Sequence, residues 1–308
     1  MTDRRITIDC DYLGPEIACA YLRVSGDECA FVETNTAFAV PRLLAALAES
    51  GHKPEDVRWI IVTHVHLDHA GGAGVLAAAC PNATVLAHPS AARHLRDPSK
   101  LIAGAEAVYG EARFAELYGE IRAIDASRVR ELADGERFDF GAGSMCVHHT
   151  RGHANHHFVV EDPACATVFS GDTFGLAYPA LQRGGPFAFP STSPVGFHAT
   201  EAHASVDRIL ALNSETICFT HFGSHGGRDT LQTMAEQLHE WIDFSEGLRV
   251  GLAGDAQRPG AYDEVHAALR AHMQTMAERH HLTLDAADWE LLALDLDLNA
   301  QGIVAVAR

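Results

Sequence analysis

The segment THVHLDH, residues 63–69, constrains the fold of this chain more than any other feature. It follows the apolar, β-branched run VRWIIVT (residues 57–63), which is typical of a buried strand, and it precedes the glycine-rich run AGGAGVLAAAC (residues 70–80), which indicates the start of a helix. Three imidazoles and one carboxylate therefore lie in a loop between a strand and a helix. In layered α/β proteins, ligand sites lie at such strand ends. The segment predicts an α/β fold with a metal site at this strand end.

The spacing within the segment separates its side chains into two directions. His64 and His66 are two residues apart, so in extended backbone they project to the same side and can reach one cation. Asp68 and His69 come where the chain turns into the helix, so we expect them to point elsewhere. Four groups with two directions indicate two adjacent metals rather than one.

Three further candidate ligands each follow an apolar strand, as His64 does. His153 comes after the run SMCVHHT, Asp172 after ATVFS and His221 after TICFT. The ends of neighbouring strands in a sheet meet at one edge, so we expect these side chains to lie near the histidine-rich loop.

The remaining pattern alternates strands and helices, which places the chain in the α/β class. A hairpin is expected from residues 17–24 and 29–34, a helix from Pro41 to Ser50, and mainly helix from 89 to 120. Residues 249–263 contain Gly and Pro and predict a linker. We therefore expect a catalytic domain over 1–248, with a helical insertion at about 98–120, and a mainly helical C-terminal extension over 249–308. The insertion is either a lid or an oligomer contact.

Charge and cysteine content limit the partners and the compartment. The chain carries 23 basic and 41 acidic residues, a formal net charge of −18, which disfavours binding to nucleic acid or an anionic membrane. Its seven cysteines form no CxxC pair, which fits reduced thiols in a cytoplasmic protein. No run approaches the roughly 20 apolar residues of a membrane helix. We expect a small-molecule substrate, no nucleic acid, no membrane, and possible homo-oligomers.

The order HxHxDH at residues 64–69, then His153, Asp172 and His221, resembles the metallo-β-lactamase superfamily over about residues 15–225. The resemblance implies an αββα sandwich with two metals at one edge of its two sheets, and here a helical C-terminal extension. It also implies the ligands: His64, His66 and His153 for the first metal, Asp68, His69 and His221 for the second, and Asp172 as the bridge. The segment THVHLDHAGG is similar to the glyoxalase II and acyl-homoserine-lactone lactonase branches.

This ligand set suits zinc chemistry. Three neutral imidazoles bind Zn²⁺ and leave a position open for water, whose pKa the metal lowers to roughly 7. We therefore expect two Zn²⁺ ions per chain, although Fe and Mn accept the same ligands. Asp172 and Asp68 are the candidate catalytic carboxylates, Asp172 as the bridge and Asp68 to orient the nucleophile or accept its proton.

Departures from the family limit the subclass. His66 stands where flavodiiron proteins carry Glu, and Asp172 stands where many β-lactamases carry Cys. Lactonases place a Tyr shortly after the bridging Asp, where this chain has Phe174, and Tyr178 is the nearest phenol. The basic residues with which glyoxalase II holds glutathione have no match in the C-terminal region. The resemblance therefore does not assign the substrate of either branch to this chain.

The leading hypothesis is a dinuclear metal-dependent hydrolase that uses a metal-bound hydroxide on an ester, lactone, thioester or phosphodiester of a small molecule. The alternatives are a mononuclear iron enzyme like the persulfide dioxygenases, which share the histidine loop, and a non-catalytic metal-binding protein. Two features stay open. His156 and His157 either line the cleft or begin a strand, and residues 174–190 form either a substrate wall, which we favour, or a surface loop.

Overall fold

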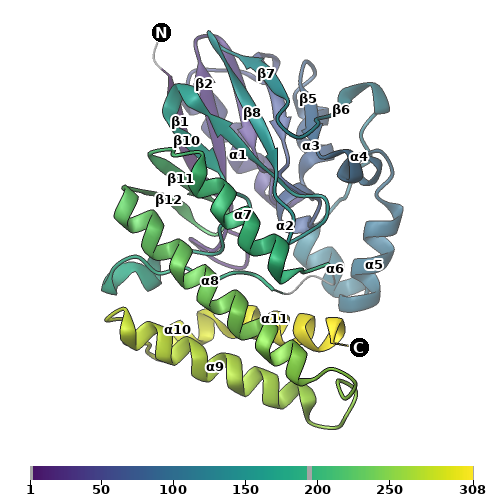
Figure 1. Cartoon of the computed structure of the whole chain (residues 1–308). Coiled ribbons are helices and arrows are strands. Elements are labelled where there is room, and N and C mark those ends of the chain that lie inside the picture. Colours follow the sequence, from purple (N-terminus) through teal and green to yellow (C-terminus); the bar gives the residue numbers. More distant parts are fainter. Residues whose placement is uncertain (1–2, 193–195, 308) are drawn as a thin grey trace.

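The computed structural model describes residues 3–192 and 196–307, which form two six-stranded sheets with helices on their outer faces (Figure 1). The first sheet has the order β1–β2–β3–β4–β5–β6. Its strands are β1 (Arg4–Asp9), β2 (Cys19–Ser25), β3 (Glu28–Val32), β4 (Val57–Ile61), β5 (Thr84–Ala87) and β6 (Val129–Glu131). The first three strands are antiparallel, and β3 to β6 are parallel to one another. The expected hairpin is therefore confirmed as β2–β3.

The second sheet has the order β12–β11–β10–β9–β8–β7. Its strands are β7 (Arg137–Phe140), β8 (Gly143–His149), β9 (Phe158–Asp162), β10 (Thr167–Phe169), β11 (Thr216–Phe219) and β12 (Gly223–Gly226). Only the pair β10–β11 is parallel among these. The candidate ligand segments therefore come from two sheets, and only those of Asp172 and His221 follow neighbouring strands, β10 and β11.

Strand β2 shows why the two sheets stack. Its residues are buried on both faces, which explains their continuous apolar sequence. Successive side chains alternate between faces, so Leu22 packs under the helices of the first layer while Tyr21 packs between the sheets. There Tyr21 contacts Phe169 of β10 edge to face, with the ring centroids 5.2 Å apart. The facing apolar surfaces of the two sheets thus form one core.

One buried ion pair also joins the sheets. Arg23 of β2 is fully buried, and its Nε lies 2.5 Å from Oδ2 of Asp162, at the end of β9. The Arg23 guanidinium also donates to the backbone carbonyl of Arg4. A charge in a core is tolerated when it is paired and hydrogen-bonded in this way.

The outer layers are helical. The first sheet is covered by α1 (Val40–Glu49), α3 (Ala73–Ala79) and α4 (Pro89–Arg96). The short α2 (Leu67–Ala70) packs with α5 (Ser99–Tyr109) and α6 (Glu111–Tyr118) in a separate apolar cluster around Leu67. Helices α7 (Ala199–Ala211) and α8 (Arg228–Gly251) cover the second sheet, and α9 (Ala261–Arg279), α10 (Ala286–Leu291) and α11 (Ala293–Val306) pack beyond α8. The αββα sandwich with a helical C-terminal region is confirmed. Within the described residues, no helix is long and apolar enough to cross a membrane.

Two local expectations need correction. Only residues 252–260 of the expected linker are non-helical, because α8 continues to Gly251 and Leu252 is buried in the C-terminal core. The favoured substrate wall at 174–190 is instead mainly core. Its large apolar side chains pack against the C-terminal helices in a cluster that includes Leu176, Leu181, Phe187, Phe189, Trp241 and Met273.

Candidate metal centre

The histidine-rich loop is fixed between β4 and α2. The Thr34 N–H donates to the carbonyl of His69 (2.9 Å), and the Phe158 N–H donates to that of Thr63 (3.0 Å). The loop therefore contacts both sheets. The glycines after it allow close packing: a Cβ on Gly72 would lie 2.7 Å from the Thr36 carbonyl oxygen. That contact is too short for any other residue, which explains the AGGAG sequence.

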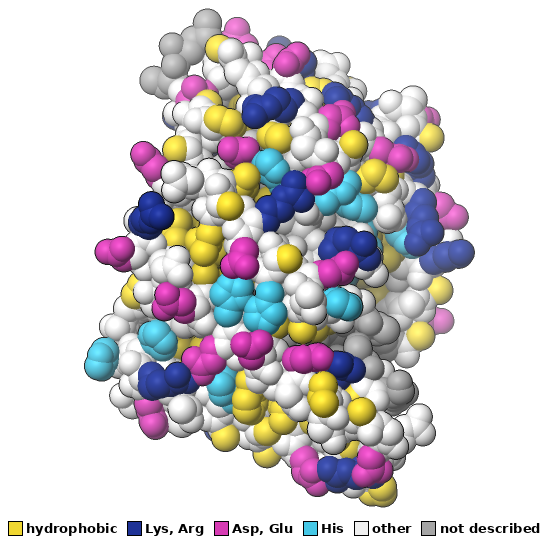
Figure 2. Space-filling view, viewed as in Figure 1, with side chains coloured by type: hydrophobic (Ala, Val, Ile, Leu, Met, Phe, Trp, Pro, Cys, Tyr) yellow, Lys and Arg dark blue, Asp and Glu magenta, His cyan; other side chains and the backbone are white. Residues whose placement is uncertain are grey.

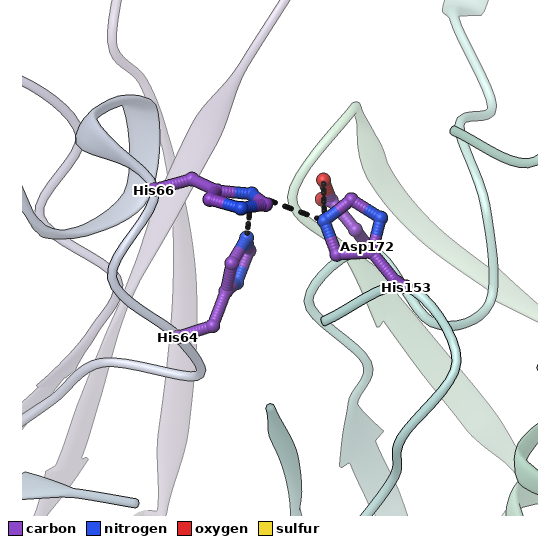
Figure 3. A group of neighbouring side chains, drawn as sticks. All are labelled: His64, His66, His153 and Asp172. Carbon is purple, nitrogen blue, oxygen red and sulfur yellow. Dashed lines mark hydrogen bonds and ion pairs between the residues drawn. The ribbon is translucent and has the colours of Figure 1, made fainter. Parts of the chain in front are cut away.

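Four of the predicted ligands form a first group (Figure 3). His64 Nε2 lies 2.8 Å from His66 Nδ1, and His153 Nε2 lies 3.1 Å from the same atom. Asp172 Oδ2 lies 3.4 Å from His153 Nε2. One atom from each of the four residues falls within 4.8 Å of the others, so all four can reach one ion.

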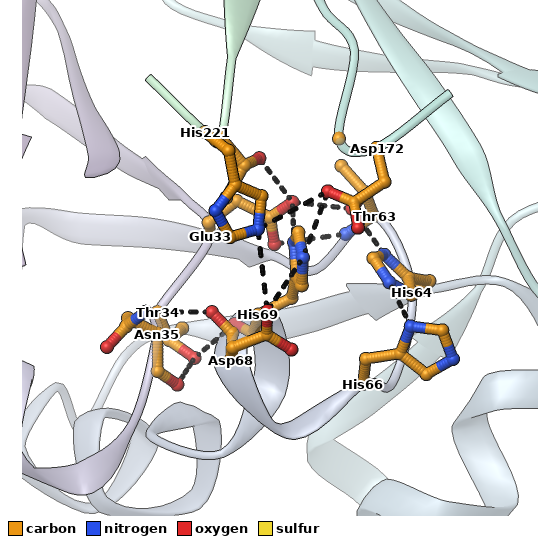
Figure 4. Close-up of polar contacts among 12 residues, drawn as sticks. Glu33, Thr34, Asn35, Thr63, His64, His66, Asp68, His69, Asp172 and His221 are labelled. Carbon is orange, nitrogen blue, oxygen red and sulfur yellow. Dashed lines mark hydrogen bonds and ion pairs between the residues drawn. The ribbon is translucent and has the colours of Figure 1, made fainter. Parts of the chain in front are cut away.

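The other three predicted ligands form a second group (Figure 4). His221 Nε2 lies 3.4 Å from Asp68 Oδ2, and His69 Nε2 lies 3.7 Å from it. The second oxygen of Asp172, Oδ1, lies 3.1 Å from His69 Nε2 and 3.6 Å from His221 Nε2. Asp172 thus presents one oxygen to each group. The structure brings all seven residues together in the two predicted groups, which share Asp172. Metal binding by these groups remains a prediction.

The second nitrogen of several imidazoles has its own partner, which fixes the orientation of each ring. His153 Nδ1 lies 3.2 Å from the Ser191 carbonyl oxygen, and His221 Nδ1 lies 3.0 Å from that of Ile17. A carbonyl oxygen only accepts, so in both rings Nδ1 carries the proton and Nε2 is left for a ligand. Such outer contacts set the tautomer of metal-binding histidines.

Glu33 is a site residue that the sequence analysis missed. It follows β3 and is almost fully buried. Its Oε1 lies 3.1 Å from His69 Nδ1 and accepts hydrogen bonds from the hydroxyls of Thr63 and Thr220. The signal was available: Glu33 is a carboxylate directly after a buried strand, like Asp172. Glu33 is not part of the HxHxDH, His153, Asp172 and His221 pattern from which the other residues were predicted.

The two uncertain histidines differ in role. His157 is buried, and its Nε2 accepts a hydrogen bond from the backbone N–H of Asp172 (3.2 Å), so it holds the loop that presents the bridging carboxylate. Gly171 permits this contact, because it adopts φ +50° and a Cβ there would lie 2.4 Å from His157 Nε2. The His156 ring lies 5.6 Å from that of His66, and burial lowers its pKa to about 4. His156 therefore lines the first group.

Burial and neighbouring charges set the protonation of the site. Burial, reinforced by the surrounding imidazoles, lowers the pKa of His64 and lowers that of His66 to about 3. Burial also lowers the pKa of His153, despite the nearby Asp172. These three imidazoles are therefore neutral at pH 7, the form that binds metal.

The carboxylates and the remaining imidazoles carry opposite charges. Burial would raise the pKa of Asp68 and Asp172, but the imidazoles around them outweigh it and lower both values. Burial would lower the pKa of His69 and His221, but Asp172 and Asp68 outweigh it and raise both. The carboxylates are thus ionised, and their negative charge favours positive charge on His69 and His221, as it would favour a bound cation.

Two buried atoms test whether this donor set fits a metal. His69 Nε2 and Asp172 Oδ1 are both buried and have no hydrogen-bond partner among the described residues, although they lie 3.1 Å apart. A buried polar atom without a partner costs about 1–3 kcal/mol. A divalent cation bound by both would remove that cost, and imidazole with carboxylate is a donor set that zinc accepts. The residues therefore fit the predicted metals.

Comparison with known proteins agrees with this geometry. The sequence profile of the metallo-beta-lactamase superfamily matches residues 14–221. The chain is 28% identical over 205 residues to the metallo-beta-lactamase fold-containing protein ST1585 of Sulfurisphaera tokodaii, covering 64% of this chain and 72% of that protein. It is 31% identical over 209 residues to Glyoxylase B2 of Dictyostelium discoideum, and the match covers 64% of this chain and 60% of that protein. The solved structure of ST1585 from Sulfolobus tokodaii superposes with a TM-score of 0.66 at 21% identity, covering 98% of this chain and 99% of the other.

Proposed function

Because the chain belongs to the metallo-β-lactamase superfamily, whose members are mostly metal-dependent hydrolases, we propose that it is a dinuclear metal-dependent hydrolase. Its substrate would be an ester, lactone, thioester or phosphodiester of a small molecule. One observation carries the proposal: two groups of ligand atoms share the carboxylate of Asp172. A dinuclear centre needs such a bridging group, whereas a mononuclear centre leaves Asp68 and His221 without a role.

Zinc is the metal we propose, with iron or manganese as substitutes that accept the same ligands. His64, His66 and His153 would hold one ion, Asp68, His69 and His221 the other, and Asp172 both. A pair of such ions supplies Lewis acidity, which acidifies water and polarises a carbonyl or phosphoryl oxygen.

The side chains around the ions have separable tasks. Glu33 and His157 fix His69 and the Asp172 loop, and neither is open to solvent. The Asp68 side chain is 25% exposed, against 6% for Asp172, so it is the carboxylate that meets solvent and substrate. We assign to Asp68 the orientation of the attacking water and the acceptance of its proton.

The proposed partners follow from charge and thiol chemistry. Figure 2 shows Lys and Arg side chains scattered among acidic ones over the face covered by α7 and α8, which suits a small molecule better than a polyanion. All seven cysteines are free thiols and six are buried, which supports a reducing compartment such as the cytoplasm.

Elemental analysis combined with an Asp172→Ala variant tests the proposal. We expect two zinc ions per chain in the wild type, and loss of at least one ion together with loss of hydrolysis in Asp172→Ala. Asp139→Ala is the matched control, because Asp139 is exposed on β7 and its carboxylate accepts no hydrogen bond within the described residues, while its carbonyl accepts one from Trp59. Full metal content and activity in Asp172→Ala would overturn the proposal.

The same measurements separate the other two hypotheses. One iron per chain with oxygen uptake on glutathione persulfide would identify a dioxygenase. Bound metal that stabilises the fold without turnover of any ester, lactone, thioester or phosphodiester probe would identify a non-catalytic protein.

A further inference from the structure

Two histidines face each other where α7 packs on α8, on helices that supply none of the seven predicted ligands. The rings of His203 on α7 and His239 on α8 are stacked, with their planes 16° apart and their centroids 4.9 Å apart. Their Nδ1 atoms are only 2.6 Å apart. Both side chains are 28% exposed, so solvent reaches the pair. Figure 2 shows histidine and acidic side chains close together on this face.

Each ring has a carboxylate at its other nitrogen. His203 Nε2 lies 2.9 Å from Asp243 Oδ1, and His239 Nε2 lies 3.1 Å from Asp207 Oδ1. Each aspartate follows the histidine of its own helix by four residues, so both side chains lie on one helical face. Each histidine, however, pairs with the aspartate of the other helix, which the antiparallel packing of α7 and α8 permits. The side chains thus form the series Asp243–His203–His239–Asp207.

This series has one hydrogen too few when both rings are neutral. It contains three short polar contacts, and each needs a hydrogen or another cation between its two atoms. A carboxylate oxygen only accepts, and a neutral imidazole carries one N–H. Two neutral rings can therefore satisfy both carboxylates, but the two Nδ1 lone pairs then face each other. The other tautomers leave a bare ring nitrogen against a carboxylate. A cation between the rings, either a shared proton or a metal ion, satisfies all three contacts.

The surroundings of the rings favour a metal ion. Metal-binding histidines ordinarily donate their other ring N–H to a carboxylate or carbonyl, which fixes the ring and makes the ligand nitrogen more basic. Both His203 and His239 have such a carboxylate. Their Nδ1 atoms are about as close as His64 Nε2 and His66 Nδ1 in the first predicted group, which are 2.8 Å apart. Zn–N bonds of about 2.0–2.1 Å need a slightly larger separation, which a small rotation of the partly exposed rings supplies.

We propose that His203 and His239 bind a divalent transition-metal ion at a second site, outside the candidate metal centre. The ion would be one that imidazole suits, such as Zn²⁺, and it would join α7 to α8. Asp243 and Asp207 are positioning residues that orient the rings, and water completes the coordination. This assignment does not depend on the proposed hydrolase function. With only two protein nitrogens, the second site binds more weakly than the seven-residue centre, so dialysis empties it while the centre keeps its metal.

The competing explanation is that the two rings only share a proton and have no affinity for metal. His266 on α9 supplies a matched control, because it is also a partly exposed helical histidine but faces only the ring of Tyr262, at 5.9 Å. A shared proton predicts the same zinc uptake for the wild type, His203→Ala, His239→Ala and His266→Ala.

The test is a calorimetric titration of Zn²⁺ into the full chain after it has been loaded with zinc and dialysed. The wild type and His266→Ala should each take up one ion more per chain than His203→Ala and His239→Ala. Asp243→Asn keeps the shape of the side chain but removes its charge, and it should lower the affinity for that ion about 10–100-fold. Excess zinc should also raise the Tm of the dialysed wild type, since the ion binds only the folded pair of helices, and should raise that of His203→Ala less.

The difference between the wild type and the two histidine variants decides the outcome. Equal zinc uptake by the wild type, His203→Ala and His239→Ala overturns the inference. Circular dichroism checks that each variant folds, and His203→Gln replaces the alanine variant if that one does not. Metal content after dialysis tests the candidate centre separately. A dialysed chain without two ions, whose later uptake still depends on His203, removes the dinuclear centre and keeps the second site.

Discussion

Oδ1 of Asp172 lies 3.1 Å from Nε2 of His69, and both atoms are buried without a hydrogen-bond partner among the described residues. Two polar atoms this close would ordinarily share a hydrogen bond. Here they form an ion pair whose alignment does not satisfy a hydrogen bond, so both atoms can bind the same cation. Metal binding and the stability of the fold should therefore be coupled at this point.

Removal of metal should lower the thermal stability. A metal present at 100 times its Kd stabilises the native state by about 2.7 kcal/mol, so chelation should lower the Tm by about 4 °C in a chain of 308 residues. Differential scanning calorimetry with and without EDTA measures the change, and added Zn²⁺ should reverse it. Asp172→Ala should respond much less. An unchanged wild-type Tm would contradict the predicted metal centre.

Replacement of Glu33 by Gln should weaken metal binding. The amide keeps the shape of the side chain but removes the charge that faces His69 Nδ1 and accepts from Thr63. Loss of such an outer partner costs about 10–100-fold in metal affinity. Competition with a chromogenic zinc chelator measures it. Glu28→Gln is the control, since Glu28 begins the same strand but pairs with Arg58 at the surface. Equal zinc affinities of Glu33→Gln and Glu28→Gln would show that Glu33 does not support the metal centre.

The buried pair between Arg23 and Asp162 should be much more sensitive than an exposed pair. Both side chains are almost fully buried, so Asp162→Ala leaves an uncompensated charge and should cost about 3–5 kcal/mol of unfolding free energy. In the surface pair, the Arg58 and Glu28 side chains are 38% and 36% exposed, and Glu28→Ala should cost less than about 1 kcal/mol. Urea denaturation at pH 7 measures the unfolding free energy of both variants. Similar losses in Asp162→Ala and Glu28→Ala would contradict the prediction.

His88 should make the stability depend on pH. It caps α4 by accepting a hydrogen bond from the Ser90 N–H, and burial, with His149 nearby, lowers its pKa to about 4. The unfolded chain binds a proton near pH 6.5, and the folded chain only near pH 4, so this stability is present above pH 6.5 and is lost as pH falls toward 4.

The His88→Asn variant isolates that effect, because Asn also caps helices but does not titrate. The stability advantage of the wild type over His88→Asn should be larger at pH 7 than at pH 5. Denaturant unfolding at the two pH values measures the difference. A stability advantage of the wild type over His88→Asn that is larger at pH 5 than at pH 7 would contradict the prediction.

The sequence predicted which side chains lie close together better than it predicted the sheets that carry them. Each predicted ligand follows a strand with a strong apolar pattern, such as the run before His64 or the run before His221. Strand β12 has the sequence GSHG, and it is a strand only because it pairs with β11. No local pattern indicates a strand of that composition.

Glu33 was missed for a different reason. Glu33 follows a strand that pairs in parallel with β4, and this pairing was not visible in the sequence. Long-range packing also explains why residues 174–190 were misread, since the core that buries them comes from the end of the chain.

The division of the seven side chains between the sheets has a consequence for biosynthesis. The first sheet leaves the ribosome with His64, His66, Asp68 and His69, and neither of the two predicted ligand groups is complete before the second sheet has supplied His153, Asp172 and His221. Asp172 is common to both groups, so neither can mature ahead of it. A nascent or truncated chain would thus compete poorly with cellular metal buffers. Metal loading of the predicted centre would therefore have to wait until the two sheets have docked.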